Sequence, residues 1–298
     1  MHVKVLHQMV GHVRPIYCLS EGFNSGTILS GSSDRFVAEW DLKAGSPTNF
    51  SIKLTSIPYS LLPLQDRGCL LIGNSSGEIH FIDVAKKHEI KCLKVFSSAV
   101  FKLVSDGRFF YASSSEGELA IGSLDTFEIH KVVKVCQEKI RHLAIDFLNQ
   151  TLLLSCGDGF TRLVALQTGN FIAEFQSHSQ STNCALLLPN NQLLTGGRDA
   201  HLNYWIKSNT SYQLKKSIPA HNFAIYDLAI APNGETIATA SRDKTIKLWN
   251  TNLDIPLRLD KSKFNGHDFS VNTLHWNKQT NLLLSAGDDR SIIVWKTD

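Results

Sequence analysis

The sequence contains a four-residue pattern that recurs at nearly fixed spacing. In four places an Asp precedes a Trp by six residues, a hydroxyl residue lies four residues before the Asp, and a His lies 17 or 18 residues before the hydroxyl. Four sets with matching spacing indicate an internal structural repeat. The sets are His12, Ser30, Asp34 and Trp40; His178, Thr195, Asp199 and Trp205; His221, Thr239, Asp243 and Trp249; and His267, Ser285, Asp289 and Trp295.

The third set shows what one repeat contains. Residues 221–250 hold three short apolar runs, separated by Asn233-Gly234 and by Arg242-Asp243-Lys244. Short alternating runs joined by polar turns predict a meander of antiparallel strands. One such sheet is too small to bury its own faces, so we expect it to stack on copies of itself.

Two dipeptides relate these repeats to a known family. The sequence has Gly-His at residues 11–12 and 266–267, and Trp-Asp at residues 40–41. With the recurring quartet, it resembles the WD-repeat (WD40) β-propeller family over essentially the whole chain. The resemblance implies an all-β fold, a seven-bladed β-propeller of four-stranded antiparallel blades. It also implies that each quartet is a buried hydrogen-bond chain inside one blade.

The turn positions of the repeats extend the pattern to seven blades. They fall at residues 34, 76, 116, 158, 199, 243 and 289, which are 40 to 46 residues apart. The second, third and fourth repeats lack the quartet. Replacing a whole buried polar set by apolar groups costs less than removing one member of it. In the third repeat we expect Phe96 to fill the space that Ala112 and Gly122 leave.

The two ends of the sequence predict how the propeller closes. The seventh repeat stops after its third strand, whereas residues 2–10 alternate like a strand that has no blade. We therefore expect residues 2–10 to complete the seventh blade, which closes the ring and removes an exposed sheet edge. Residues 1–298 would then form a single domain.

Composition and motifs exclude several functions. The net charge of +3 and the absence of a long basic run argue against nucleic-acid binding. No phosphate loop and no His or carboxylate cluster with metal spacing is present, so we expect neither a metal nor a cofactor. None of the six cysteines is two residues from another, which gives no zinc ribbon or redox pair.

No run reaches the ~18 apolar residues of a membrane span, and no signal peptide is visible. We expect a soluble, cytoplasmic protein without a membrane partner.

The recurring His, hydroxyl and Asp could be mistaken for a hydrolase triad. A catalytic triad occurs once and is recognised by geometry and role, whereas this set occurs four times at a fixed repeat. We therefore expect no catalytic residues and a structural role for all four quartets.

The resemblance places the functional surface on the top face, where loops between blades meet the turn inside each blade. Aromatic and basic residues gather at three predicted positions per blade, and these residue types dominate binding hot spots. The predicted partner-binding residues are Tyr17, Tyr59, Phe101, Lys139, Arg141, Arg198, Tyr226 and Arg242. Because Arg binds carboxylate and phosphate groups in a bidentate manner, we expect an acidic or phosphorylated peptide segment.

The resemblance thus implies a non-enzymatic scaffold that binds peptide or protein segments. The alternative is a propeller enzyme with a small-molecule site in the central channel, although Asp288 is the only free carboxylate predicted on that face. The sequence does not identify the partner, and it leaves open a monomer or a subunit of a complex.

Overall fold

The computed structural model describes residues 2–297 and shows a seven-bladed β-propeller fold built from seven four-stranded antiparallel sheets. The predicted fold class is confirmed. The strands of the first six sheets, in order along the chain, are β2 (Ile16–Glu21), β3 (Thr27–Ser32), β4 (Phe36–Asp41) and β5 (Ser46–Lys53); β6 (Pro58–Leu64), β7 (Cys69–Asn74), β8 (Glu78–Asp83) and β9 (His88–Lys94); β10 (Val100–Ser105), β11 (Phe109–Ser114), β12 (Glu118–Ser123) and β13 (Glu128–Lys134); β14 (Ile140–Asp146), β15 (Thr151–Cys156), β16 (Phe160–Ala165) and β17 (Phe171–Gln176); β18 (Thr182–Leu188), β19 (Gln192–Gly197), β20 (His201–Ser208) and β21 (Ser211–Pro219); β22 (Ile225–Ile230), β23 (Thr236–Ser241), β24 (Ile246–Asn250) and β25 (Leu257–Leu259).

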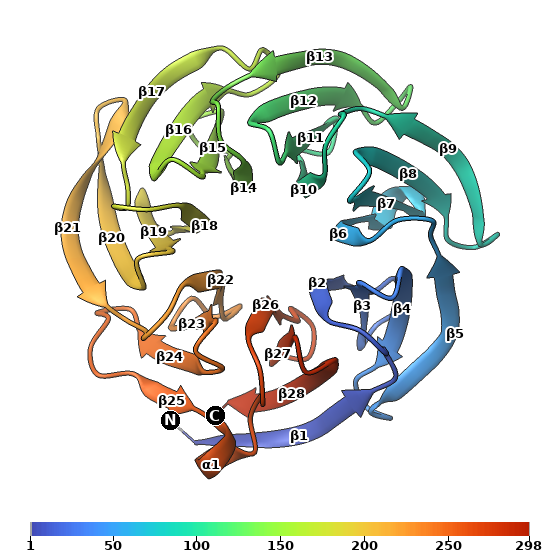
Figure 1. The fold of residues 1–298 in the computed structure, drawn as a ribbon, viewed down its shortest axis with the longest axis vertical. Helices are drawn as coiled ribbons and strands as arrows, with labels where there is room; N and C mark the ends of the chain where they lie inside the picture. Colours follow the sequence, from blue (N-terminus) through green and yellow to red (C-terminus); the bar gives the residue numbers. More distant parts are fainter. Residues whose placement is uncertain (1, 298) are drawn as a thin grey trace. The chain divides into compact units, whose positions relative to one another are not determined.

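The seventh sheet joins the two ends of the chain. It contains β26 (Val271–Trp276), β27 (Leu282–Gly287) and β28 (Ser291–Thr297), and its fourth strand is β1 (Val3–Val10). Figure 1 shows β1 running along the outer side of β28, with which it pairs antiparallel. The prediction that the N-terminal strand completes the last blade is confirmed.

The described residues form two compact units. The first contains residues 2–70, 83–88 and 226–297, and the second contains residues 71–82 and 89–225. Two short helices accompany the strands, a 3-10 helix at Gln65–Arg67 and α1 at Lys261–Phe264. The single domain expected over residues 1–298 stays a prediction.

Burial explains why the second strand of a sheet reads as a continuous apolar run. All six residues of β3, of β7 and of β15 are buried, whereas the fourth strands β9 and β17 are mostly exposed. A strand covered on both faces needs apolar or small residues at every position. In the first unit, Trp295, Leu283 and Ala238 pack in one such core, and in the second unit Leu152, Ile140 and Leu119 pack in another.

The turn between the second and third strands requires a left-handed backbone. Gly77 and Gly117 adopt φ values of 81° and 80°, and a Cβ on either would lie 2.2 Å from a carbonyl oxygen of the next loop. Only glycine meets both conditions without strain. In the first repeat Arg35 takes the equivalent position with φ 71°, so the tight turn is kept even where the residue is not glycine.

Candidate binding surface

Several predicted binding positions share one backbone feature, a β-bulge at the start of the first strand of the sheet. In the first sheet, for example, the pairing of β2 with β3 passes from Ile16 directly to Cys18. A bulged residue is unpaired, and the bulge re-aims its side chain. The residues skipped in this way are Tyr17, Phe101, Arg141, Asn183 and Asn272.

In the first unit, the structure brings together two of the predicted tyrosines. The rings of Tyr17 and Tyr59 have centroids 5.4 Å apart and are tilted by 53°. Burial, and then the neighbouring Tyr59 and Asp288, raise the pKa of Tyr17. Asp288 also accepts a hydrogen bond from the Nδ2 of Asn272 at 2.8 Å. The result is a half-buried aromatic pair with a carboxylate beside it.

A groove of about 460 Å³ lies next to this pair and contains two arginines that were not predicted from the sequence. Ser33, which hydrogen bonds Tyr17, lines the groove together with Ile57, Arg14 and Arg35. Both arginines are exposed, and no ion pair joins either to a carboxylate among the described residues. Arg14 lies two residues after His12, and Arg35 directly follows Asp34, so the quartet spacing could have identified them.

In the second unit, three of the predicted basic residues lie close together. Burial and then the positive charge of Arg141 lower the pKa of Lys139; Arg198 lowers it further, and Glu138 only partly opposes them. The guanidinium of Arg141 also lies over the ring of Phe101, 5.6 Å from its centroid. These four predicted residues therefore form one local group, which we call the cationic group.

Two carboxylates of the fourth sheet, Asp158 and Glu174, are engaged by Arg162. Asp158 accepts two hydrogen bonds from Arg162, at 2.8 and 3.0 Å, and Glu174 accepts a third at 2.9 Å. Within residues 2–297, no ion pair joins Lys139 or Arg198 to a carboxylate. Lys139, Arg141 and Arg198 are three cations with one neighbouring carboxylate, Glu138, so the local net charge is positive.

A buried hydroxyl adjoins the cationic group. The backbone carbonyl of Ser181 accepts a hydrogen bond from the N–H of Arg198 at 2.8 Å. The Ser181 side chain is buried, yet its Oγ has no hydrogen-bond partner among the described residues. An unsatisfied buried polar group is costly, so this hydroxyl is a local source of instability beside Arg198.

The two remaining predicted residues belong to the first unit. Tyr226 is the second residue of β22 and is half-buried. Arg242 is exposed in the turn between β23 and β24. They occupy in the sixth repeat the positions that Tyr17 and Ser33 occupy in the first.

The recurring quartet forms a hydrogen-bond chain in the first repeat. The Nε1–H of Trp40 donates to the Oγ of Ser30 at 2.7 Å, and this Oγ lies 2.7 Å from the Nε2 of His12. The Nδ1 of His12 lies 2.9 Å from the Oδ2 of Asp34. Because a carboxylate only accepts, Nδ1 carries the proton, and Nε2 accepts from the Ser30 hydroxyl. Every member of this buried chain is satisfied.

The quartets of the fifth and seventh repeats follow the same order. The corresponding His–Asp, His–hydroxyl and Trp–hydroxyl distances are 2.9, 2.9 and 2.9 Å in the fifth repeat and 2.7, 2.7 and 2.8 Å in the seventh. In the sixth repeat the Nε1–H of Trp249 donates to the Oγ1 of Thr239 at 3.1 Å.

The aspartates of these chains are held in the charged form. Burial by itself raises the pKa of Asp34, Asp199 and Asp289, but hydrogen bonds from His12, His178 and His267 and from nearby backbone N–H groups lower it further than burial raises it. The net pKa of each carboxyl is below its ordinary value.

The third repeat differs from the sequence expectation in one packing detail. A Cβ on Gly122 would lie 2.2 Å from the Cζ of Phe110, so the ring that fills the space beside Gly122 is that of Phe110. Phe110 and Gly122 face each other across β11 and β12. Phe96 is buried as well, but this cross-strand pairing explains why Phe110 is the residue that requires the glycine.

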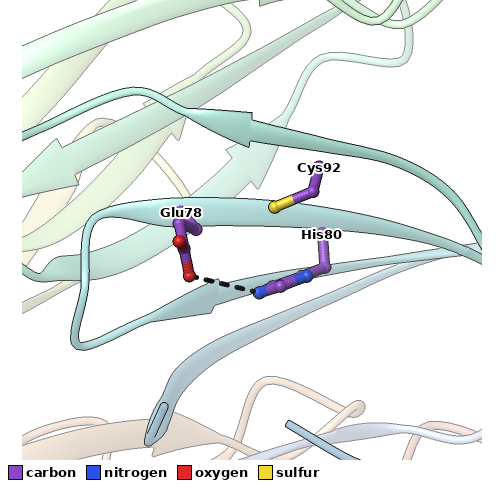
Figure 2. A group of neighbouring side chains, drawn as sticks. All are labelled: Glu78, His80 and Cys92. Atoms are coloured by element: carbon purple, nitrogen blue, oxygen red, sulfur yellow. Dashed lines mark ion pairs between the residues drawn. The ribbon is translucent and has the colours of Figure 1, made fainter. Parts of the chain in front are cut away.

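The second repeat contains a group of side chains that was not predicted from the sequence. One ligand-type atom from each of Glu78, His80 and Cys92 lies within 4.8 Å of the other two (Figure 2). Glu78 and His80 are two residues apart on β8, which places them on one face of the strand. Cys92 lies on β9, and its twelve-residue separation from His80 conceals the group in the sequence.

The chain matches one protein family. The family described as "WD domain, G-beta repeat" matches residues 3–41, 169–205, 212–250 and 260–296, together more than half of the chain. The matched repeats contain all four quartets, and the first match begins in β1, the strand that completes the last sheet.

Three curated relatives resemble the chain at low identity. It is 20% identical to rat apoptotic protease-activating factor 1 over 96% of its length and 20% identical to the human kinesin-like protein KIF21A over 99%. A Drosophila melanogaster SEC13 homolog is 28% identical over 35% of the chain. The matches span 22%, 19% and 30% of these relatives, so the chain corresponds to under a third of each.

No helix in the described part of the chain has both the length and the apolar character that crossing a membrane requires.

Proposed function

Since the chain belongs to the WD40-repeat family, whose members are typically protein-interaction scaffolds and usually non-catalytic, we propose that it binds an acidic or phosphorylated segment of a partner protein. The cationic group, Lys139, Arg141, Arg198 and Phe101, would receive the anionic side chain. Tyr17 and Tyr59, in the first unit, are proposed separately as a contact for an apolar side chain of a partner. Tyr226 and Arg242 are included because they occupy the equivalent positions of the sixth repeat.

The observation that carries the proposal is the crowding of cations beside Lys139. Arg141 and Arg198 are near enough to lower the pKa of Lys139, while Asp158 and Glu174 are engaged by Arg162. Like charges held together oppose folding, so an anionic ligand would gain affinity by relieving that repulsion.

Phe101 supports a specific orientation of the group. A guanidinium that lies over an aromatic face is held in a fixed direction. The bulge at Arg141 and the bulge at Phe101 supply the two side chains from neighbouring sheets. A carboxylate or a phosphate could therefore be recognised by geometry as well as by charge.

The test is direct peptide binding by the full chain. An array of peptides in phosphorylated, glutamate-substituted and unmodified forms would identify a ligand, and its affinity would be measured at two salt concentrations. Affinity should fall with salt, because exposed charges are screened over about 10 Å at 0.1 M. Arg198→Glu should weaken binding at least about ten-fold, since a charge-assisted hydrogen bond contributes about 1.5–3 kcal/mol.

The matched control is Arg108→Glu, which makes the same change of charge. Arg108 lies in the turn between β10 and β11, at the opposite end of β10 from Phe101. It should leave the affinity unchanged. Equal binding by Arg198→Glu and the wild type would place the site elsewhere.

A further inference from the structure

The buried imidazole of His80 lies at the centre of a polar network in the second sheet. Its Nδ1 lies 2.6 Å from the Oε2 of Glu89, and its Nε2 lies 3.0 Å from the Nδ2 of Asn74 and 3.7 Å from the Oε2 of Glu78. The His80 side chain is 9% exposed. Figure 2 shows Glu78 and His80 facing each other on one strand, with the sulfur of Cys92 turned toward them from the next.

The hydrogen bonds of Asn74 fix the tautomer of His80. The Oδ1 of Asn74 accepts the backbone N–H groups of Ser76 and Glu78, at 2.9 and 3.0 Å, so the amide must present Nδ2 to its other neighbours. Nδ2 only donates, and His80 Nε2 therefore accepts. The proton lies on Nδ1, which donates to Glu89. Nε2 is thus unprotonated, and its lone pair, which accepts the Asn74 N–H, lies beside Glu78.

This arrangement matches how proteins prepare a histidine to bind a metal. A ligating histidine donates its other N–H to a carboxylate, which fixes the ring and raises its basicity. Thiolate, imidazole and carboxylate together form a zinc ligand set, with bonds of about 2.0–2.3 Å. The three ligand atoms lie within 4.8 Å of one another. Small rotations of the Cys92 and Glu78 side chains would bring all three atoms within bonding distance of one zinc ion.

We propose that Glu78, His80 and Cys92 form a zinc site, with water as the fourth ligand and Glu89 as the orienting carboxylate. Cys92 is exposed and Glu78 is partly exposed, which gives a hydrated ion an entry path. The thiol would lose its proton to solvent as the Zn–S bond forms. No oxidant or other co-reactant is needed.

Asn74 competes with the ion in this site. Its Nδ2 lies 2.8 Å from the Oε2 of Glu78 and 3.0 Å from the Nε2 of His80, so its N–H groups point at the two lone pairs that zinc would use. Ser114 occupies the equivalent position of the third sheet, where its Oγ accepts the backbone N–H groups of Glu116 and Glu118. An Asn74→Ser substitution should therefore keep the turn, remove the competing amide and strengthen metal binding.

The experiment titrates the full chain, reduced and free of metal, with Co²⁺ as a spectroscopic substitute for Zn²⁺. The proposal predicts a thiolate-to-cobalt charge-transfer band that saturates at about one equivalent, as expected for one three-ligand site, and that Zn²⁺ removes. Cys92→Ser should abolish the band. Glu89→Ala should weaken zinc binding about 10- to 100-fold, as the loss of an outer-shell partner does, and Asn74→Ser should raise the affinity above that of the wild type.

Two controls separate this site from incidental binding. His130→Ala removes an exposed histidine that follows Glu128 on β13 with the same two-residue spacing, and it should change nothing. Because Cys92 is exposed, the Cys92→Ser variant should fold, and thermal melting without metal checks this. No thiolate band in the wild type would overturn the proposal, as would an equal band in folded Cys92→Ser.

Discussion

Met9 pairs with Ile292 in the last sheet, so residues from opposite ends of the chain are direct neighbours on β1 and β28. The pairing continues from Val3 opposite Thr297 to Val10 opposite Ser291, with one irregularity between Val5 and His7. Residues Ile292 to Trp295 of β28 are fully buried. The first strand therefore covers an edge that would otherwise be apolar and unpaired.

Deleting residues 2–10 should expose that edge. The segment Ser291 to Trp295 is apolar, uncharged and β-prone, and an unpaired strand of this kind promotes association between chains. We expect the truncated protein to aggregate or to melt far below the full chain, as measured by thermal unfolding and light scattering. A soluble monomer with an unchanged melting temperature would contradict this prediction.

Asp199→Ala should destabilise the fold by about 3–5 kcal/mol, because it leaves a buried hydrogen-bonded partner, His178, without its carboxylate. The matched control is Asp66→Ala, since Asp66 is exposed in the short helix after β6. Urea unfolding of both variants measures the difference. Similar unfolding free energies for the two would show that the quartet contributes little to stability.

Stability should also depend on pH through the quartet aspartates. The folded-state pKa of Asp34, Asp199 and Asp289 lies below the unfolded value of about 3.9. The folded state therefore binds fewer protons, and the stabilisation is fully present above that value. It should be lost as pH falls below about 4 toward the folded pKa.

Urea unfolding between pH 7 and pH 3 measures this dependence. Asp199→Asn should flatten the acid limb of the curve, because one of the three carboxyls no longer titrates. An identical acid limb in the variant would assign the pH dependence to other groups.

Two buried tyrosines should respond in opposite ways to Tyr→Phe. The hydroxyl of Tyr111 donates to the Oδ2 of Asp106 at 2.8 Å and accepts the N–H of Gln167 at 3.2 Å. The hydroxyl of Tyr212 has no partner among the described residues, and burial, followed by the charge of Asp146, raises its pKa to about 12. Tyr111→Phe should cost about 1.5–3 kcal/mol, whereas Tyr212→Phe should stabilise by about 1–3 kcal/mol.

Each variant is the control for the other, because the chemical change is the same. Denaturant unfolding followed by circular dichroism gives both values. A loss of stability in Tyr212→Phe equal to that in Tyr111→Phe would show that its hydroxyl is satisfied.

The fold was predictable because its signals are local and repeated. Asp243 and Trp249 carry the same spacing as Asp34 and Trp40, and alternation within residues 2–10 identified the strand that completes the last sheet. These features depend on strand periodicity and turn chemistry, which short windows of sequence contain. The confirmed fold class rests on these two features.

The details of the surface depend on backbone geometry that the sequence does not display. Nothing in the residue type of Tyr17 or Arg141 announces a β-bulge, since the bulge is a register shift between two strands. The group of Glu78, His80 and Cys92 was missed because a hairpin brings Cys92 back to β8. Phe96 was expected beside Gly122 because cross-strand pairing, which selects Phe110, was not considered.

The pairing of β1 with β28 sets an order of events during biosynthesis. Strand β1 is synthesised nearly 300 residues before its partner β28, an interval on the order of 15–60 s at 5–20 residues per second. During that interval Met9 and the other inward-facing residues of β1 have no native neighbour in their sheet. The polar and charged residues Lys4, His7 and Gln8 of the same strand would keep the nascent strand hydrated until the last sheet can form.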